Sequence, residues 1–305
     1  MNKTRKIVVF TISVMIIILL GASIYYLTVN STASPTLPAG TSPQGELKIT
    51  GDVETGKTLT VADLKQMPLT TITETNDGET ANYVGITITE LIKNVGAEWD
   101  VGFVSFLSGD VTKCTIDTYQ AYNSTLFSGS EYILAFVKNG QWLNGETQGT
   151  FALVAPGLER NSIVMQITEV NLQPWIIVVN GAVHQQLIIT GKDIEDYQTK
   201  TVQATYAPPD GPQRVSNWTG ITLSSILQAS KVSSDASKVT ISAIDGYSKE
   251  FSLEEAQSLG LLICYNENGV PLSQSGSQPY RLVVPSEEFK WAQFWVKWVS
   301  EIKVT

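Results

Sequence analysis

Apolar and polar residues alternate with a period of two over short stretches of the chain. Residues 47–53 (Leu-Lys-Ile-Thr-Gly-Asp-Val) alternate in this way, as strands do when one face is buried. Residues 177–183 (Ile-Val-Val-Asn-Gly-Ala-Val) are their counterpart later in the chain. Residues 132–137 and 261–265 are continuous apolar runs, which are typical of fully buried strands. The pattern therefore predicts a β-rich α+β protein with short helices between its strands.

One ten-residue pattern occurs twice, at residues 83–92 and again at 218–227, with a constant offset of 135. Each copy consists of an aromatic residue, a glycine that we interpret as a turn, a short apolar run and the first turn of a helix. Eight landmarks recur in the same order, with offsets between 129 and 135. Such ordered self-similarity indicates a duplication, with a first repeat at residues 46–174 and a second at 175–305.

Further matched elements are expected in each repeat. Short N-capped helices are predicted at residues 60–64 and 190–194, and hairpins at 104–117 and 239–252. The remaining predicted elements are strands at 70–75, 201–206, 151–156, 280–285, 166–170 and 298–302, a short helix at 253–259, and turns at Asn139-Gly140 and Asn268-Gly269.

The N-terminus has a different pattern. Residues 1–6 form a basic end that we place in the cytoplasm, and residues 7–29 then run for 23 residues without a charge. At about 1.5 Å per residue, such a helix spans roughly 35 Å, enough for a bilayer core of about 30 Å. The basic end predicts an extracytoplasmic C-terminal part. We interpret residues 7–29 as a retained single-pass anchor in the cell membrane; the alternative is a cleaved signal peptide, whose apolar region is usually roughly 7–15 residues.

Residues 30–45 are rich in Ser, Thr, Pro and Gly and carry no charge, so we expect a flexible linker. The complete chain of 305 residues has a net charge of −9. An acidic surface repels phosphate backbones, so nucleic acid is not an expected partner. Cys114 and Cys264 have no metal-ligand spacing; the sequence leaves open whether they pair or are separate core residues, and we favour the second interpretation.

Several segments of the second repeat resemble the sulfite oxidase-like molybdopterin-binding domain family. These segments are the aromatic-glycine entry to a helix, the Asn-Gly turn, residues 281–285 (Arg-Leu-Val-Val-Pro) and residues 289–298, which end in a Lys-Trp pair before the final strand. The first repeat resembles the family less closely. The resemblance implies two tandem domains of this type, with molybdopterin as the cofactor of related enzymes.

The resemblance also implies a cysteine that binds molybdenum just after the strand preceding the aromatic-glycine pattern. Residues 71–77 and 203–208 occupy that place, and neither segment contains a cysteine. A thiolate is hard to replace with a hydroxyl or a carboxylate for such a metal. Arginines that hold an anionic substrate are a second family feature, for which Arg160, Arg214 and Arg281 are the candidates. Related enzymes are exported by a twin-arginine route, whereas no Arg-Arg pair precedes the apolar run.

The candidate ligand face lies near the C-terminus, where Lys290, Trp291 and Lys297 are the predicted cofactor-binding or ligand-binding residues. Trp291, Trp295 and Trp298 have spacings of four and three, so a helical turn would place them on one face. Core packing is one interpretation of this stripe, and an aromatic wall for a planar, sugar or pterin ligand is the other. The two lysines would donate to a phosphate.

Other polar residues give weaker signals. His184 is the only histidine in the sequence, and we expect it at the surface rather than in a catalytic triad. Glu74, Asp77 and Glu79 form an acidic loop that we interpret as solvated, with a hard-cation site as the alternative. No catalytic residue and no metal ligand are predicted.

The sequence thus predicts a membrane-anchored extracytoplasmic protein with two molybdopterin-binding-domain-like repeats. Our leading hypothesis is a non-catalytic binding or interaction module for an unknown small molecule or protein, because the cysteine is absent from both copies. The alternative is a molybdopterin-dependent oxidoreductase that acts outside the membrane. A third hypothesis is a structural surface protein that uses the duplication as a spacer.

Overall fold

The structure is a computed structural model that describes residues 35–158, 162–276 and 278–305. Strands dominate it and the helices are short, so the predicted β-rich α+β class is confirmed. The predicted cytoplasmic end and anchor, residues 1–6 and 7–29, lie outside the described residues. Within the described ranges no helix is both long and apolar enough to cross a membrane. Residues 35–45 contain neither helix nor strand.

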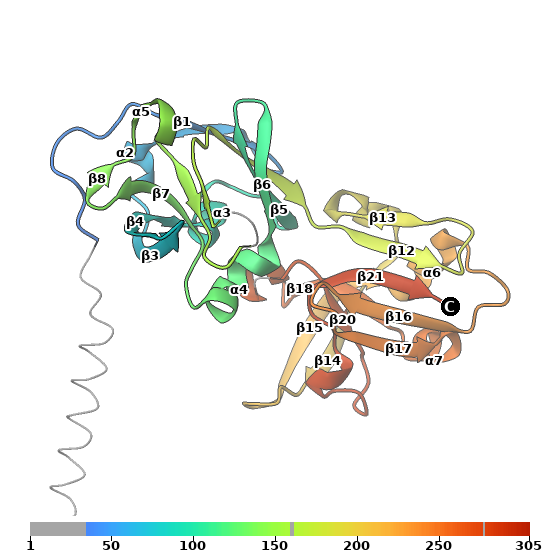
Figure 1. The fold of residues 1–305 in the computed structure, drawn as a ribbon. Coiled ribbons are helices and arrows are strands. Elements are labelled where there is room, and N and C mark those ends of the chain that lie inside the picture. The colour runs from blue at the N-terminus through green and yellow to red at the C-terminus, as the bar shows by residue number, and fades with distance from the viewer. Residues whose placement is uncertain (1–34, 159–161, 277) are drawn as a thin grey trace, which may run out of the picture.

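The first half contains two sheets (Figure 1). One has the strand order β2-β1-β11-β5-β6, and the other has the order β10-β9-β7-β4-β3, with β8 paired to β7. The strands of the first sheet are β1 (Glu46–Gly51), β2 (Lys57–Thr60), β5 (Val101–Ser108), β6 (Val111–Asp117) and β11 (Glu169–Pro174). Those of the second are β3 (Thr70–Asn76), β4 (Glu79–Thr87), β7 (Ile133–Lys138), β8 (Gln141–Trp142), β9 (Ala152–Val154) and β10 (Ile163–Val164).

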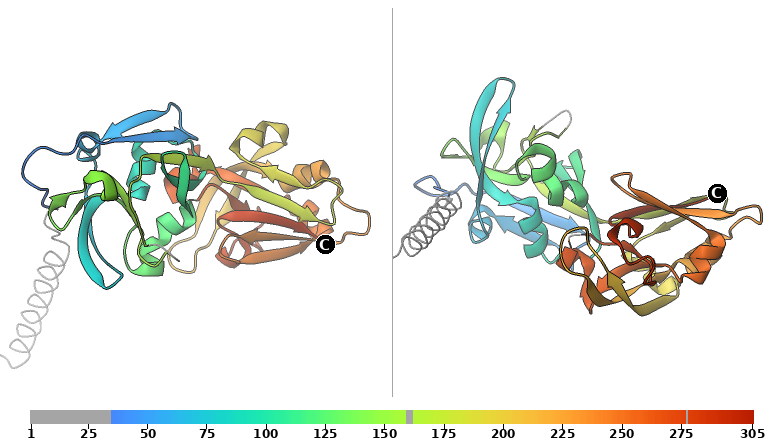
Figure 2. Two further views of the ribbon diagram at one scale, coloured as in Figure 1. Left: turned by 45° about the horizontal axis from the view of Figure 1, so that its top comes forward. Right: turned by 90° about the horizontal axis from the view of Figure 1, so that it is seen from below.

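The second half has two sheets with corresponding strand orders, β13-β12-β21-β16-β17 and β14-β15-β18-β19, with β20 paired to β18. The first of these comprises β12 (Ile177–Gly181), β13 (Leu187–Ile189), β16 (Lys238–Ala243), β17 (Ser248–Ser252) and β21 (Val299–Val304). The second comprises β14 (Thr199–Tyr206), β15 (Arg214–Thr222), β18 (Leu262–Glu267), β19 (Val270–Pro271) and β20 (Arg281–Val283). The two halves lie side by side in both views of Figure 2.

Side-chain caps begin several of the short helices. Thr60 and Asp63 form a capping box at α2, where the Thr60 N–H donates to Asp63 Oδ2 at 2.7 Å. The equivalent Thr190 N–H donates to Asp193 Oδ2 at 2.8 Å, although the turn it begins is a 3-10 helix. The helices are α2 (Val61–Leu64), α3 (Ile88–Asn94), α4 (Thr118–Ser128), α5 (Gly145–Gln148), α6 (Leu223–Ser230), α7 (Leu253–Ser258), α8 (Leu272–Gly276), η1 (Gly191–Asp196) and η2 (Ala292–Phe294).

The glycine of the repeated pattern lies within a strand, so its interpretation as a turn is wrong. Gly85 in β4 and Gly220 in β15 each follow a shift in strand register. A Cβ at Gly85 would lie 2.0 Å from the carbonyl oxygen of Leu134, and one at Gly220 would lie 2.4 Å from the Cα of Cys264. Glycine is needed there because the neighbouring strand approaches too closely for a side chain.

The two Asn-Gly turns are confirmed. Asn139, Gly140, Asn268 and Gly269 all have positive φ angles, between 51° and 84°, as expected of a tight hairpin that requires two left-handed residues. Each asparagine side chain also accepts a backbone N–H from a neighbouring strand at 2.9 Å. Local sequence is therefore sufficient to form these hairpins.

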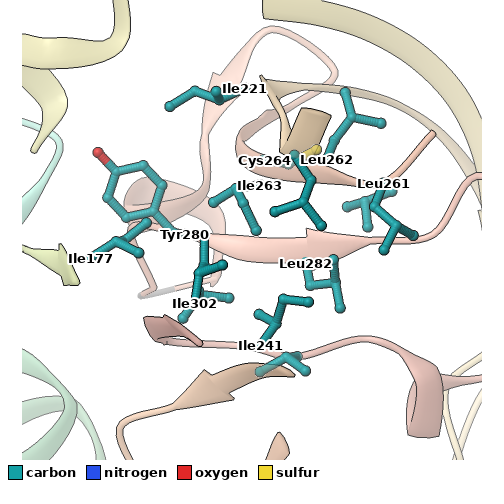
Figure 3. Close-up of a cluster of buried hydrophobic side chains, with 14 of the residues drawn as sticks. Ile177, Ile221, Ile241, Leu261, Leu262, Ile263, Cys264, Tyr280, Leu282 and Ile302 are labelled. Carbon is teal, nitrogen blue, oxygen red and sulfur yellow. The ribbon is translucent and has the colours of Figure 1, made fainter. Parts of the chain in front are cut away.

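Each half has its own apolar core. Figure 3 shows part of the core of the second half, in which Ile177, Ile241, Leu282 and Ile302 come from four strands. These four side chains are 0% exposed. The Tyr280 ring lies at the edge of the same cluster, and its hydroxyl group is directed away from the aliphatic side chains.

Aromatic rings join the halves where β11 leads into β12. Trp175 is buried and its Nε1–H donates to the carbonyl oxygen of Val299 at 2.7 Å. Trp298 packs against Trp175 and against Tyr119 of α4, with ring centroids 5.4 and 5.3 Å apart. Trp298 has a φ of 54°, which is rare for a bulky residue and costly without compensating contacts. Burial between the halves provides those contacts.

Candidate functional site

The segment with the predicted ligand face, residues 289–298, is not a regular helix. Its only helical part in the structure is the 3-10 turn η2, Ala292–Phe294. Trp291 is 48% exposed, whereas Trp295 and Trp298 are buried. The prediction of three tryptophans on one helical face is therefore wrong, because the extended backbone on both sides of η2 directs the rings to different places. The core-packing interpretation holds for Trp295 and Trp298.

Trp295 belongs to the core of the second half. Its ring packs against Tyr206 and Trp218, with centroid distances of 5.0 and 5.2 Å. Its Nε1–H donates to the carbonyl oxygen of Phe289 at 2.9 Å. Tyr206 is the last residue of β14, so this aromatic cluster includes a residue of the segment 203–208, in which the resemblance implies a cysteine.

Lys290 and Trp291 lie beside that same segment. The Ala207 N–H donates to the carbonyl oxygen of Lys290 at 2.8 Å, and the Ala292 N–H donates to the carbonyl oxygen of Ala207 at 2.9 Å. The Lys290 ammonium group forms an ion pair with Glu287 at 3.3 Å. The fold therefore brings two of the three predicted ligand residues next to the cysteine-equivalent position. Their role in binding stays a prediction.

Lys297, the third predicted residue, lies beside two arginines. Its backbone pairs with that of Arg281 in an isolated antiparallel bridge. Although much of the Lys297 side chain is exposed, surrounding protein lowers its pKa, and the positive charges of Arg281 and Arg214 lower it further. Three cations therefore lie within electrostatic range of one another.

Arg281 is the most unusual polar residue of the site because it is buried, with only 3% of its surface exposed. Its guanidinium carbon lies 5.2 Å from the Tyr206 ring centroid and 5.4 Å from that of Trp218, as in cation–π contacts. Its Nε and Nη1 atoms have no hydrogen-bond partner in the described part of the chain. Burial lowers the pKa of Arg281. A buried arginine normally forms hydrogen bonds to an anionic partner, whereas here Glu267 acts on Arg281 through its charge alone.

Arg281 lines a cavity of about 430 Å³ at the ends of β15 and β18. Arg214 Nε forms an ion pair with Glu267 Oε1 at 3.1 Å, and the Ser216 hydroxyl donates to the same oxygen at 2.7 Å. Glu267 thus forms its ion pair with Arg214. Its negative charge also acts on Arg281, whose Nε and Nη1 form no hydrogen bond to it. The full lining comprises Arg214, Val215, Ser216, Glu267, Asn268, Leu272, Gln278 and Arg281.

The first half has a cavity at the equivalent place, with a volume of about 760 Å³. There the ion pair has its charges exchanged, because Glu79 stands at the position of Arg214 and pairs with Lys138 at 3.8 Å. Ala152 stands at the position of Arg281: it pairs with Ala135 of β7 as Arg281 pairs with Cys264 of β18. The equivalent cavity therefore has no buried cation.

The donor set at the cysteine-equivalent position does not fit a molybdenum centre. Tyr206 and Ala207 occupy it, and both are buried. Cys264 is fully buried in β18, where burial raises the pKa of its thiol, and Cys114 lies in β6; both are free. Within the described residues, no three side chains of His, Cys, Asp or Glu gather in a metal-binding group. The orphaned nitrogens of Arg281 fit an anion, and no group here supplies a thiolate.

The remaining candidates from the sequence lie away from this site. His184 is exposed, as are Asp77 and Glu79, and Glu74 is partly exposed. Arg160 lies outside the described residues. Arg281 was included among candidate arginines but not in the predicted ligand face. The sequence did contain a signal for Arg281: it is the first residue of the otherwise apolar segment 281–284, and a charge in such a segment is buried with the strand.

Comparisons with known proteins found one family model and a similar solved structure. Residues 164–305 match the family model of the oxidoreductase molybdopterin binding domain. No curated protein sequence matches the chain. A similar solved structure is the sulfane dehydrogenase SoxCD from Paracoccus pantotrophus, with 19% sequence identity, a TM-score of 0.39, and coverage of 53% of this chain and 49% of that chain. The chain thus spans about half the length of that protein. The match of residues 164–305 agrees with the family resemblance that the sequence of the second repeat had implied.

Proposed function

We propose that this chain is a membrane-anchored extracytoplasmic protein whose second half is a non-catalytic module that binds a small anion. One observation carries the proposal. Arg281 is buried beside a cavity of about 430 Å³ and has two guanidinium nitrogens without a partner in the described chain. The ligand class follows from this geometry.

A small oxyanion or carboxylate suits these donors better than a neutral ligand does. Guanidinium groups bind carboxylate and phosphate oxygens through parallel N–H donors, and an unpaired buried charge is costly until such a partner arrives. Ser216 at the cavity wall is a further polar group, and Lys297 adds positive charge nearby. The indole of Trp291 is exposed beside the Lys290 ammonium, and it offers a planar surface for an aromatic part of the ligand.

The first half is proposed to be a second, degenerate repeat of the same domain, which occupies residues 46–174. The corresponding strand orders support this proposal, as do the matching pairs at Gly85 and Gly220. The first half has Ala152 where the second has Arg281. We therefore assign anion binding to the second half alone.

The non-catalytic assignment rests on the donor chemistry of residues 206–207, because neither Tyr206 nor Ala207 can provide a thiolate. The family match of residues 164–305 favours a second candidate, a molybdopterin-dependent oxidoreductase. In that case Arg281, Lys297 and Lys290 would bind the anionic part of the pterin cofactor, and the cofactor would supply the redox chemistry.

Isothermal titration of the full chain with inorganic phosphate tests the anion site. Arg281→Met is expected to weaken binding at least about tenfold, because one buried charge-assisted contact is worth roughly 1.5–3 kcal/mol. Lys138→Met in the equivalent cavity of the first half is the matched control, and it should leave the affinity unchanged. Equal affinities for all three proteins would refute the assignment to Arg281.

Metal and pterin analysis separates the two candidates. The chain is purified from a host that makes the cofactor, and molybdenum is measured by elemental analysis and pterin by fluorescence. The non-catalytic proposal expects neither. One molybdenum and one pterin per chain would overturn it in favour of the oxidoreductase, and Arg281→Met should then release the pterin.

The proposed anchor has a separate test. Residues 7–29 should keep the chain in the membrane fraction after an alkaline wash, and protease added outside intact cells should degrade the C-terminal domains. Release of the chain by the wash, or full protection from the protease, would contradict the proposed location.

A further inference from the structure

Two buried carboxyl groups meet where the halves contact each other. Asp52 follows β1 and Asp100 precedes β5, and they are 5% and 4% exposed. Both contact the start of η1 in the second half: Asp100 Oδ2 accepts the Gly191 N–H at 2.7 Å, and Asp52 Oδ1 lies 3.2 Å from the Lys192 ammonium. We refer to the two carboxyl groups as the Asp52–Asp100 pair.

The contact between η1 and the Asp52–Asp100 pair is close enough to depend on whether the carboxyl groups are protonated. A Cβ at Gly191 would lie 2.4 Å from Asp100 Oδ2 and 3.0 Å from Trp99 Cζ2. The Asp100 backbone carbonyl accepts the Trp175 N–H at 2.6 Å. Asp100 therefore holds the second half through both its side chain and its backbone, and a small movement of the carboxyl group would be transmitted to η1.

Few positive charges surround the pair. Lys192 and Asp193 approach it from η1, and the Lys192 side chain is 78% exposed. From the second half, Tyr280 before β20 and Tyr265 of β18 face the same region, and the buried Tyr280 hydroxyl has no partner in the described chain. Burial raises the pKa of Tyr280, and the charges of Asp100 and Asp193 raise it further. The tyrosines therefore stay neutral, and one exposed lysine is the counter-charge.

Burial raises the pKa of Asp100 to about 6. Besides burial, the negative charge and the side chain of Asp52 contribute to this rise in the pKa of Asp100, whereas the Gly191 N–H opposes it. A hydrogen bond between two carboxyl groups requires that one of them holds a proton. The pair therefore has a single negative charge when it is protonated and two when it is not.

We propose that the contact between the halves is a pH-sensitive lock, closed by one proton shared by Asp52 and Asp100 and loosened when that proton leaves. Asp52 Oδ2 is buried and has no hydrogen-bond partner among the described residues. With the proton bound, this oxygen shares it with Asp100 and one negative charge faces Lys192. After its loss two carboxylates repel each other at a buried site, and separation from η1 relieves the repulsion.

The direction in which pH changes the stability of the contact follows from the number of protons bound in each state. In the unfolded or separated state an aspartate has a pKa of about 3.9. Between about pH 4 and pH 6 the closed state therefore binds more protons than the open state, so the contact weakens as pH rises through this window. Below the window the stabilisation from the proton is complete, and above it no further change is expected.

Asp100→Asn tests the lock directly. An asparagine amide can donate to Asp52 and its carbonyl can accept the Gly191 N–H, so this variant copies the protonated state at every pH. Relative to the wild type, the melting temperature of Asp100→Asn should be similar at pH 4.5 and about 5 °C higher at pH 7.5. Hydrogen exchange provides a local readout: the protection factor of the Gly191 amide should fall about tenfold over this range in the wild type and stay constant in the variant.

Two further variants keep the test decisive. Asp117→Asn is the control: burial also raises the pKa of Asp117, but this residue caps α4 within the first half. The Gly191 amide of this variant should therefore keep the wild-type dependence of protection on pH. Asp52→Asn removes the second charge and should also abolish that profile. Parallel profiles for the wild type, Asp100→Asn and Asp52→Asn between pH 4.5 and 7.5 would overturn the proposal.

Discussion

Replacing Arg281 with methionine should increase stability and weaken anion binding at least about tenfold, and the two effects can be measured in one experiment. Arg281 is buried with Nε and Nη1 unpartnered, and each such group costs about 1–3 kcal/mol. Its contacts with the rings of Tyr206 and Trp218 return about 0.5–2 kcal/mol each. Methionine keeps much of the packing because it is long, unbranched and makes favourable contacts with aromatic rings.

The balance predicts that, without added anion, Arg281→Met has a free energy of unfolding about 1–2 kcal/mol greater than the wild type, as for other replacements of buried ionic groups by apolar ones. Bound anion should remove or reverse this difference. At one hundred times its Kd, a ligand stabilises the wild type by about 2.7 kcal/mol, and a variant that binds at least tenfold more weakly gains no more than about half of this.

Urea denaturation with and without millimolar phosphate is the assay, at constant ionic strength. Any general effect of phosphate on stability appears equally in Arg281→Met, so the difference between the proteins isolates the site. Lys138→Met is the matched control, because it lies in the equivalent cavity of the first half and its ion pair with the exposed Glu79 is worth about 0–1 kcal/mol. Two results would refute this account of Arg281. One is that Arg281→Met without phosphate is more than about 1 kcal/mol less stable than the wild type. The other is that phosphate increases the free energy of unfolding equally in both proteins.

The other predictions concern packing and thiol exposure. Gly220→Ala, and equally Gly85→Ala, should lower the free energy of unfolding by about 3 kcal/mol, because the new methyl group meets the neighbouring strand; an unchanged melting temperature would contradict the bulge assignment. Trp298→Ala should cost about 3 kcal/mol or more and make the junction between the halves susceptible to limited proteolysis; loss of stability without new cleavage would show that the ring acts only in the core. Cys114 should react with a thiol reagent in the native protein, whereas Cys264 is 0% exposed and should react only on unfolding; equal rates would contradict its burial.

Predictions from the sequence succeeded where a few neighbouring residues determine the structure. The capped turn at Thr60, the Asn-Gly hairpins and the buried run in β18 follow from backbone preferences and local hydrogen bonds that act over three or four residues. Repetition of these signals at near-constant offsets indicated which elements correspond in the two halves. The family resemblance of the second half was also carried by short local motifs.

Sequence periodicity failed where distant strands determine the environment. The spacing of Trp291, Trp295 and Trp298 was compatible with a helix, but pairing of the flanking residues with segments near Ala207 and Arg281 keeps the backbone extended. Gly220 has the composition of a turn and lies in a strand because β18 passes too close for a side chain. Strand register and the close approach of two strands depend on both segments involved, so neither can be predicted from the sequence of one segment.

The sequence by itself determined the short strands, their turns and caps, the family match of residues 164–305, and the lack of a cysteine at the expected place. Only the tertiary structure placed Arg281 beside Arg214 and Lys297, and Asp52 beside Asp100. The physical reason is that charge and burial depend on which residues surround a group in space. Those neighbours come from segments separated by tens of residues, which only the folded chain brings together.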